Sequence, residues 1–165
     1  MRQKTRNRKG FTLAETLIVV LILGLMTSAG AVATSAVMAT RIGMIQTADA
    51  EILGSTAFQA LANELRFGQN IKVDTDGKYV ELDSITYGLG KKLIQSNGKI
   101  KYGDGDEDQI LGDAAYSGLS ISDLGFELQA DGSIKISLAV SGNKGKLWSG
   151  NLTVTPLNGK PEAIN

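Results

Sequence analysis

The chain has 165 residues, with 17 basic and 17 acidic side chains, and it contains neither histidine nor cysteine. Disulfides, thiolate catalysis and imidazole metal ligands are therefore excluded, and the commonest general base is missing, so we expect a protein that is not an enzyme. The zero net charge is misleading: five basic residues lie within positions 1–10, which leaves 12 basic against 17 acidic residues, a balance of −5, in the remainder. This mildly acidic remainder argues against nucleic acid as a stable partner.

Residues 11–39 form an apolar run in which Glu15 is the only charged side chain. As a helix this run would measure about 43 Å, against about 30 Å for the hydrocarbon core of a bilayer, so it is long enough to span a membrane. The basic residues before it predict that residues 1–10 stay in the cytoplasm and that the chain after about residue 40 is exported. A carboxylate inside such a run is costly to insert, which suggests a functional role.

The residues of this segment leave three interpretations open. The first is a single-pass signal anchor that tolerates Glu15 near the cytoplasmic interface. The second is a secretory signal peptide that is cut after Ala33. The third is a leader that is cut at Gly10, so that the apolar helix stays on the mature protein. Small residues are frequent at positions 27–40 and permit close packing of one helix on another.

Residues 10–15 read Gly-Phe-Thr-Leu-Ala-Glu. Together with the basic leader and the apolar run, they resemble the class III signal of type IV pilins and pseudopilins, over about the first 40 residues. Gly24 falls where many members of that family have a glycine that loosens the helix. Val32 departs from the pattern, because many Gram-negative major pilins have proline there. This departure favours a minor or Gram-positive-type pilin, although major pilin, minor pilin and pseudopilin are not separated by these residues.

The resemblance implies a mechanism of processing and assembly. A prepilin peptidase/methyltransferase would cut after Gly10, where the missing Cβ lets a protease approach closely, and would methylate the new amine of Phe11. Glu15 of a neighbouring subunit would neutralise that ammonium, because an unpaired charge is far costlier than a paired one in a low dielectric. This pairing would set the register of helices in a filament, whose extension an assembly ATPase and a platform protein would drive.

The helical pattern continues to about residue 67, and Gly68 is the expected C-terminal cap. Two apolar stripes follow helical spacing and are offset around the helix: Ile45, Ala48 and Ile52, and then Phe58, Leu61, Ala62 and Leu65. Gly43 and Gly54 are predicted weak points, each costing about 1 kcal/mol relative to alanine. The second half of the helix is expected to cover a sheet.

From residue 70 onward the pattern changes to short alternating strands separated by glycine turns. Two-residue turns are predicted at 76–77 and 97–98, and a three-residue loop at 130–132. Each choice places apolar side chains together on one face. The predicted cross-strand neighbours are Val73 and Val80, Ile71 and Leu82, Leu93 and Tyr102, Leu128 and Ile134, and Phe126 and Ile136.

The last predicted strand covers residues 146–155, with Trp148, Leu152 and Val154 on one face. The expected fold is α+β and pilin-like, with a long N-terminal helix whose second half packs on an antiparallel β-sheet head. The expected parts are a leader (1–10), a helix (11–68, with 11–39 as the transmembrane or filament-core portion) and the head (69–165). A strand over 85–87 and a hairpin over 128–140 show a weak similarity to minor pilins and pseudopilins.

Asp104, Asp106 and Asp108 belong to the densest acidic cluster. Alternate aspartates suit oxygen-ligated Ca²⁺, but an EF-hand loop would need glycine and glutamate where this chain has Gln109 and Ala115. We therefore favour a solvated turn, with no metal or other cofactor, and keep calcium as the alternative.

These observations predict a structural subunit that assembles through its N-terminal helix into a type IV pilus or pilus-like filament. It would cross the cytoplasmic membrane once, with its N-terminus in the cytoplasm, and become extracellular in the pilus. Its partners would be other pilin subunits, the processing enzyme and the membrane. The alternative from a different class is a membrane-anchored, exported binding domain that does not polymerise.

Overall fold

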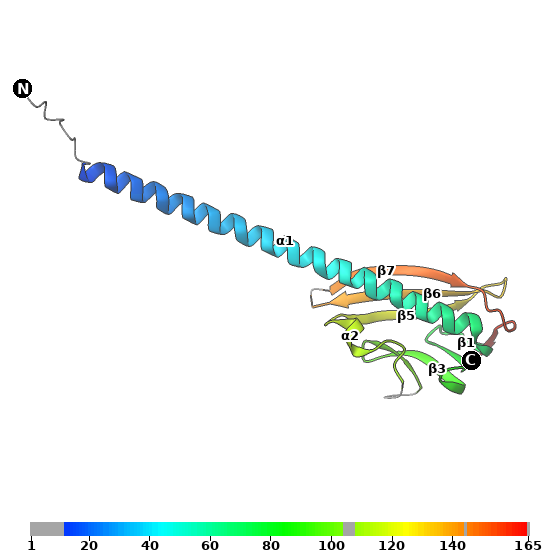
Figure 1. Ribbon diagram of the computed structural model, residues 1–165. Coiled ribbons are helices and arrows are strands. Elements are labelled where there is room, and N and C mark those ends of the chain that lie inside the picture. Colours follow the sequence, from blue (N-terminus) through cyan, green and yellow to red (C-terminus); the bar gives the residue numbers. More distant parts are fainter. Residues whose placement is uncertain (1–11, 104–107, 144, 165) are drawn as a thin grey trace, which may run out of the picture. The chain divides into compact units, whose positions relative to one another are not determined.

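The computed structural model describes residues 12–103, 108–143 and 145–164 (Figure 1). The chain forms two compact units, Met1–Gly43 and Met44–Asn165. Helix α1 (Leu13–Phe67) begins in the first unit and ends in the second, and the described strands all belong to the second unit. The fold class is α+β, with a long N-terminal helix, as predicted.

In the first unit, α1 presents apolar side chains around its circumference. Leu17 and Val20 are 63% and 69% exposed, and by length and composition the helix includes a stretch apolar enough to cross a membrane. The hydroxyl groups of Thr27 and Thr34 donate to backbone carbonyl oxygens one turn earlier, at 2.9 and 2.8 Å. A hydroxyl satisfied in this way costs less to place in lipid than a free one.

In the second unit, α1 buries one face, formed by Ala50, Leu53, Gly54, Ala57, Leu61 and Leu65. The predicted stripe from residue 58 to residue 65 is confirmed, since Leu61 and Leu65 are fully buried. The stripe of Ile45, Ala48 and Ile52 is not part of this face, because Ile45 and Ile52 are 50% and 63% exposed, and the prediction that the two stripes are offset around the helix is confirmed. Helical spacing identifies an apolar row, but the position of the sheets decides which row is buried.

Helix α1 ends at Phe67, next to the predicted terminator Gly68. Gly68 still donates its N–H to the carbonyl oxygen of Glu64 at 2.8 Å, and the left-handed residue comes later, at Asn70 with a φ of 51°. A Cβ atom at Gly68 would lie 2.8 Å from both the Glu64 carbonyl oxygen and a methyl group of Leu82. Glycine is therefore needed for the close approach of helix and strand, and not for a left-handed cap.

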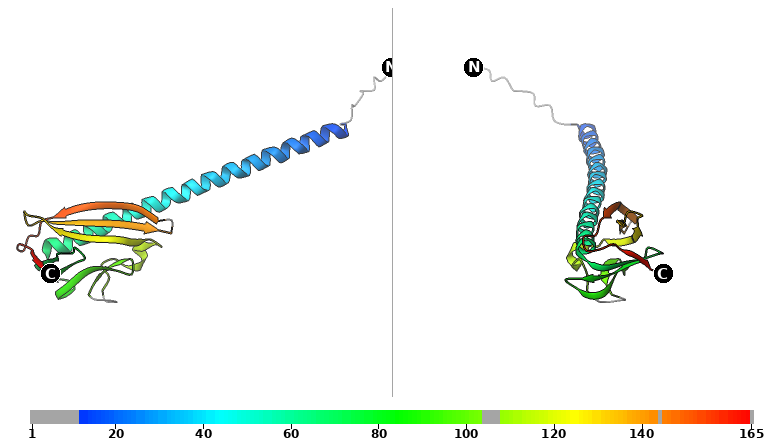
Figure 2. Two further views of the ribbon diagram at one scale, coloured as in Figure 1. Left: turned by 180° about the vertical axis from the view of Figure 1, so that it is seen from behind. Right: turned by 90° about the vertical axis from the view of Figure 1, so that its right-hand side faces the viewer.

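The strands form a five-stranded sheet of order β4-β3-β2-β1-β8 and a three-stranded sheet of order β5-β6-β7 (Figure 2). A single helical turn, α2 (Asp113–Tyr116), precedes β5. The strands are β1 (Gln69–Asp74), β2 (Tyr79–Ser84), β3 (Gly88–Ser96), β4 (Lys99–Tyr102), β5 (Ser120–Leu128), β6 (Ile134–Gly142), β7 (Gly145–Val154) and β8 (Glu162–Ile164).

The antiparallel prediction holds for every described strand pair except β1 and β8, which are parallel. A parallel pair requires a long connection, and here the chain forms six other strands between β1 and β8. Neither the division into two sheets nor the return of β8 has a local signal in the sequence.

Most of the predicted cross-strand pairs are confirmed: Val73 with Val80, Leu93 with Tyr102, Leu128 with Ile134, and Phe126 with Ile136. The pairing of Ile71 with Leu82 stays a prediction, because the register of β1 and β2 shifts between Gln69 and Lys72. The first loop is also longer than predicted, since β1 ends at Asp74 and β2 begins at Tyr79.

The loop at 97–98 has the predicted length. Asn97 and Gly98 have φ angles of 51° and 73°, as a two-residue turn with two left-handed positions requires. β5 ends at Leu128 and β6 begins at Ile134, but the N–H of Gln129 donates to the Ser133 carbonyl oxygen at 2.8 Å and so closes the predicted three-residue loop. In the loop at 130–132, Gly132 has a φ of 83° and donates its N–H to Gln129 at 3.0 Å. The last predicted strand corresponds to β7, which ends at Val154.

The predicted strand at 85–87 is wrong, because these residues form a turn between β2 and β3. The hydroxyl oxygen of Ser84 accepts the N–H groups of Thr86 and Tyr87, at 3.1 and 3.2 Å. These bonds draw the backbone out of the ladder, which is how serine commonly ends regular structure. The ring of Tyr87 then packs on that of Tyr102, with 4.4 Å between the ring centroids.

The core of the second unit lies between α1 and the two sheets (Figures 1 and 2). On the β7 side, a Cβ atom at Gly54 would overlap the ring of Trp148, and the Phe58 ring meets the same indole edge-on at 5.5 Å. Gly54, predicted as a weak point of the helix, is therefore the position that admits the tryptophan. Glycine has a low helix propensity, but its missing side chain leaves room for the close contact between helix and sheet.

Candidate functional site

The first turn of α1 is closed by a reciprocal pair of hydrogen bonds between Thr12 and Glu15. The N–H of Glu15 donates to the Thr12 hydroxyl oxygen at 3.3 Å, and the N–H of Thr12 donates to Oε2 of Glu15 at 3.2 Å. This arrangement is a capping box, in which an N-cap threonine and a glutamate three residues later satisfy each other's backbone donors. The sequence contains its signature, Thr-x-x-Glu, although the role predicted for Glu15 was only one between subunits.

The Glu15 carboxylate lies at the positive end of the helix dipole, which favours a negative charge. Its side chain is exposed, and the described residues engage it through Oε2, which also accepts the Thr12 hydroxyl at 3.2 Å. An exposed carboxylate at the start of an apolar helix is able to accept a cation from outside the chain. Capping and pairing with a cation therefore involve the same group.

Gly10 and Phe11, the residues of the predicted cleavage and methylation, lie outside the described residues. Gly24 lies within uninterrupted α-helix, where a Cβ atom would meet nothing within 4 Å, and its carbonyl oxygen accepts the Thr27 hydroxyl at 3.0 Å. The helix is also continuous through Val32. The predicted flexibility at Gly24 stays a prediction.

Residues 5–31 match the family model of the prokaryotic N-terminal methylation motif. The chain is type IV pilin-like. The matched segment includes residues 5–10 of the predicted leader, both processing residues, Glu15 and Gly24. Together, the motif and the apolar helix indicate a membrane-anchored, type IV pilin-like protein. Comparison with curated proteins and with solved structures found no match.

The acidic cluster gives no support for a metal site. Asp104 and Asp106 lie outside the described residues, and Asp108 is exposed, with its backbone carbonyl oxygen accepting the Tyr102 N–H at 2.9 Å. Within the described parts of the chain, no group of three or more acidic side chains is placed to hold a metal ion. The favoured solvated turn and its calcium alternative therefore both stay predictions.

Sequence reasoning missed a polar cluster beneath α1 that links the helix to the five-stranded sheet. Oε2 of Glu64 accepts the Tyr102 hydroxyl at 2.7 Å and the Ser84 hydroxyl at 2.9 Å. Burial and the bond to the Glu64 carboxylate raise the pKa of Tyr102 above its ordinary value. The available signal was a lone glutamate between the buried positions Leu61 and Leu65.

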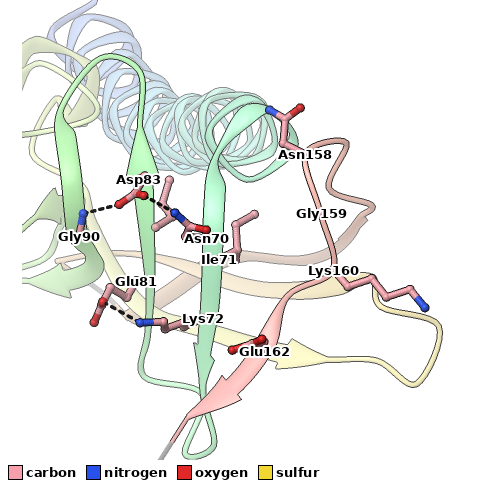
Figure 3. A pocket seen from close by; sticks show the side chains of 11 residues that line it. Asn70, Ile71, Lys72, Glu81, Asp83, Gly90, Asn158, Gly159, Lys160 and Glu162 are labelled. Atoms are coloured by element: carbon pink, nitrogen blue, oxygen red, sulfur yellow. Dashed lines mark hydrogen bonds and ion pairs between the residues drawn. The ribbon is translucent and has the colours of Figure 1, made fainter.

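A second missed feature is a polar groove of about 420 Å³ along β1 and β2 (Figure 3). In it, Asp83 accepts the Asn70 side-chain amide and the Gly90 N–H, both at 2.6 Å, and these bonds hold the pKa of Asp83 below its usual value. Lys72 and Glu81 form an ion pair at 3.6 Å. Most charges of the groove are therefore already engaged within the chain, which disfavours a highly charged ligand.

Proposed function

We propose that the protein is a prepilin whose mature form is a structural subunit, not an enzyme, of a type IV pilus or pilus-like filament. Cleavage after Gly10 and methylation of Phe11 would precede assembly through α1. The observation that carries this proposal is the methylation motif over residues 5–31, which continues directly into an apolar helix capped by Glu15.

The role proposed for Glu15 is to neutralise the methylated ammonium of a neighbouring subunit. The exposure of its carboxylate and its position in the first helical turn support this role. In lipid, an ammonium without a counter-ion is far costlier than a paired one, so the pair would favour one register between neighbouring helices.

The proposed topology places residues 1–10 in the cytoplasm and the second unit outside the membrane. The basic leader supports this orientation, because cytoplasmic flanks of membrane helices are enriched in lysine and arginine. The proposed partners are other pilin subunits and a prepilin peptidase/methyltransferase, with an assembly ATPase and a platform protein acting indirectly.

Mass spectrometry of the mature N-terminus tests the processing step. We expect a chain that begins with N-methylated Phe11. An intact Met1 would instead indicate the non-polymerising anchor, and a start at Thr34 would indicate ordinary secretion.

Two substitutions of Glu15 separate its possible roles. Glu15→Gln retains the acceptor oxygen and hence the capping box, whereas Glu15→Val removes both the cap and the charge. We expect both variants to be inserted and processed but to be largely absent from sheared filaments, because both lack the counter-ion. Incorporation of Glu15→Gln at the parental level would show that capping, not charge, is what assembly requires.

A further inference from the structure

Residues 155–161, here called the strap, connect β7 of one sheet to β8 at the edge of the other. The chain has two prolines, Pro156 and Pro161, and both lie in the strap. Each fixes its own φ and restricts the residue before it to extended conformations. The strap therefore does not continue the β7 ladder, and its backbone bends at residues 157–159.

The strap and β8 are attached mainly by backbone groups. The N–H of Leu157 donates to the Arg66 carbonyl oxygen at 3.0 Å, and the Asn158 side chain donates to the Phe67 carbonyl oxygen at 2.7 Å. β8 adds three parallel pairings with β1. None of residues 155–164 is buried, and Leu157 is 65% exposed. A segment that buries so little apolar surface belongs to the low-stability part of a fold.

The strap crosses a hollow instead of packing on the sheet. The groove of about 420 Å³ lies between β1 and the strap, with Ile71 on one side and Asn158, Gly159 and Lys160 on the other (Figure 3). Side chains that line a hollow lose part of the dispersion energy that close packing provides. Detaching the strap therefore sacrifices few contacts.

We infer that β8 of one copy pairs with β1 of a second copy of this chain in the assembled filament, so that straps join neighbouring heads. This inference rests on the proposed function, because a filament supplies the neighbour. The edge of β1 already binds residues 162–164 in one register, with Lys72 opposite Glu162, and a second copy offers the identical segment. The exchange therefore replaces each pairing of β8 with β1 by the same pairing between chains.

The length of the strap and the effective concentration of neighbouring subunits also permit this exchange. Seven extended residues span at most about 25 Å, which takes β8 well away from the end of β7. Subunits held side by side have a high effective concentration for one another, so even a weak strand pairing is populated. An unrelated peptide would have neither the matching register nor this proximity.

Disulfide trapping tests the exchange, and the absence of native cysteine makes it unambiguous. In the double variant Lys72→Cys/Glu162→Cys the two thiols sit at paired positions of β1 and β8. Filaments of this variant, oxidised after assembly, are expected to give dimers and longer ladders on a non-reducing gel. The control Ser137→Cys/Asn151→Cys joins paired positions of β6 and β7 and is expected to give monomers only.

A mixing experiment covers the case in which the double variant assembles poorly. Cells that express a Lys72→Cys chain together with an epitope-tagged Glu162→Cys chain are expected to yield a tagged heterodimer. Filaments that contain only intrachain disulfides, or that trap a different protein at Lys72→Cys, would overturn the exchange and leave the proposed function intact. Absence of filaments from the parental chain would overturn both.

Discussion

At the scale of the residue, two glutamates of α1 have different roles because their surroundings differ. Glu15 caps the helix that carries it and remains exposed, so it is available to a partner. Glu64 lies on the sheet-facing side of the same helix and accepts hydroxyl groups from β4 and β2. The first glutamate was found from its motif. The second was missed, because a glutamate between leucines is a signal only once the strands opposite it are known.

Replacing Tyr102 with phenylalanine tests the polar cluster. Glu64 would keep Ser84 as a donor but lose its shorter bond, so we expect the free energy of unfolding to fall by about 1–2 kcal/mol. Urea unfolding of the full chain in detergent, followed by the fluorescence of the single tryptophan, measures this change. Ser137→Ala is the control, since Ser137 lies on a strand of the other sheet.

The same cluster predicts an alkaline limit to stability. The folded state raises the pKa of Tyr102, so it holds the phenolic proton more tightly than the unfolded chain does. The stabilisation is therefore complete below the ordinary tyrosine pKa of about 10 and decreases as the pH rises above it. Unfolding measured from pH 8 to pH 11 should show a steeper alkaline loss in the parent than in Tyr102→Phe. Equal slopes would contradict the prediction.

At the scale of the element, two of the glycines of α1, Gly43 and Gly54, look alike in the sequence and differ in the structure. A Cβ atom at Gly43 would meet nothing within 4 Å, whereas a Cβ atom at Gly54 would overlap the Trp148 ring. Propensity alone assigns the same cost to both. Packing reverses the expected effect of an alanine substitution on stability at Gly54, because the Trp148 ring occupies the space that a side chain there would need.

Alanine substitutions at these two positions form a matched pair. We expect Gly43→Ala to stabilise the helix by about 0.5–1 kcal/mol through propensity. We expect Gly54→Ala to destabilise the second unit by about 1–3 kcal/mol, because the indole must move. Thermal unfolding of the full chain in detergent distinguishes them, and a shift of the same sign for both would show that Trp148 does not need the space at Gly54.

At the scale of the whole molecule, the strands of the second unit differ in how extensively they pair with their neighbours. β6 is paired along its length on both sides, with β5 and β7, whereas β8 is a three-residue edge strand. Local opening costs least where few apolar contacts and few ladder bonds must be broken. The C-terminus therefore closes the edge of β1 without adding much to the core.

Hydrogen exchange of the full chain in detergent tests this gradient. We expect the amides of β6 to be the most protected among the strands and those of β8 and the strap to be the least protected. Comparable protection of β8 and β6 would show that the C-terminal segment is an integral part of the core.

The sequence by itself determined what depends on neighbouring residues. The methylation motif, the end of α1, the loop at 97–98 and the three-residue loop at 130–132 all follow from local chemistry, and the structure or the family comparison agrees with each. The turn at 85–87 also depends on a local feature, the hydroxyl of Ser84, but these residues were predicted to form a strand.

Only the tertiary structure decided which apolar row of α1 is buried, how the strands divide between two sheets, and that β8 returns in parallel to β1. The physical reason is that these choices depend on contacts between segments far apart in the chain. Helical and strand periodicity constrain which side chains share a face, but not which distant surface covers that face. Local chemistry therefore identified the N-terminal site, and long-range packing positioned the C-terminal strap.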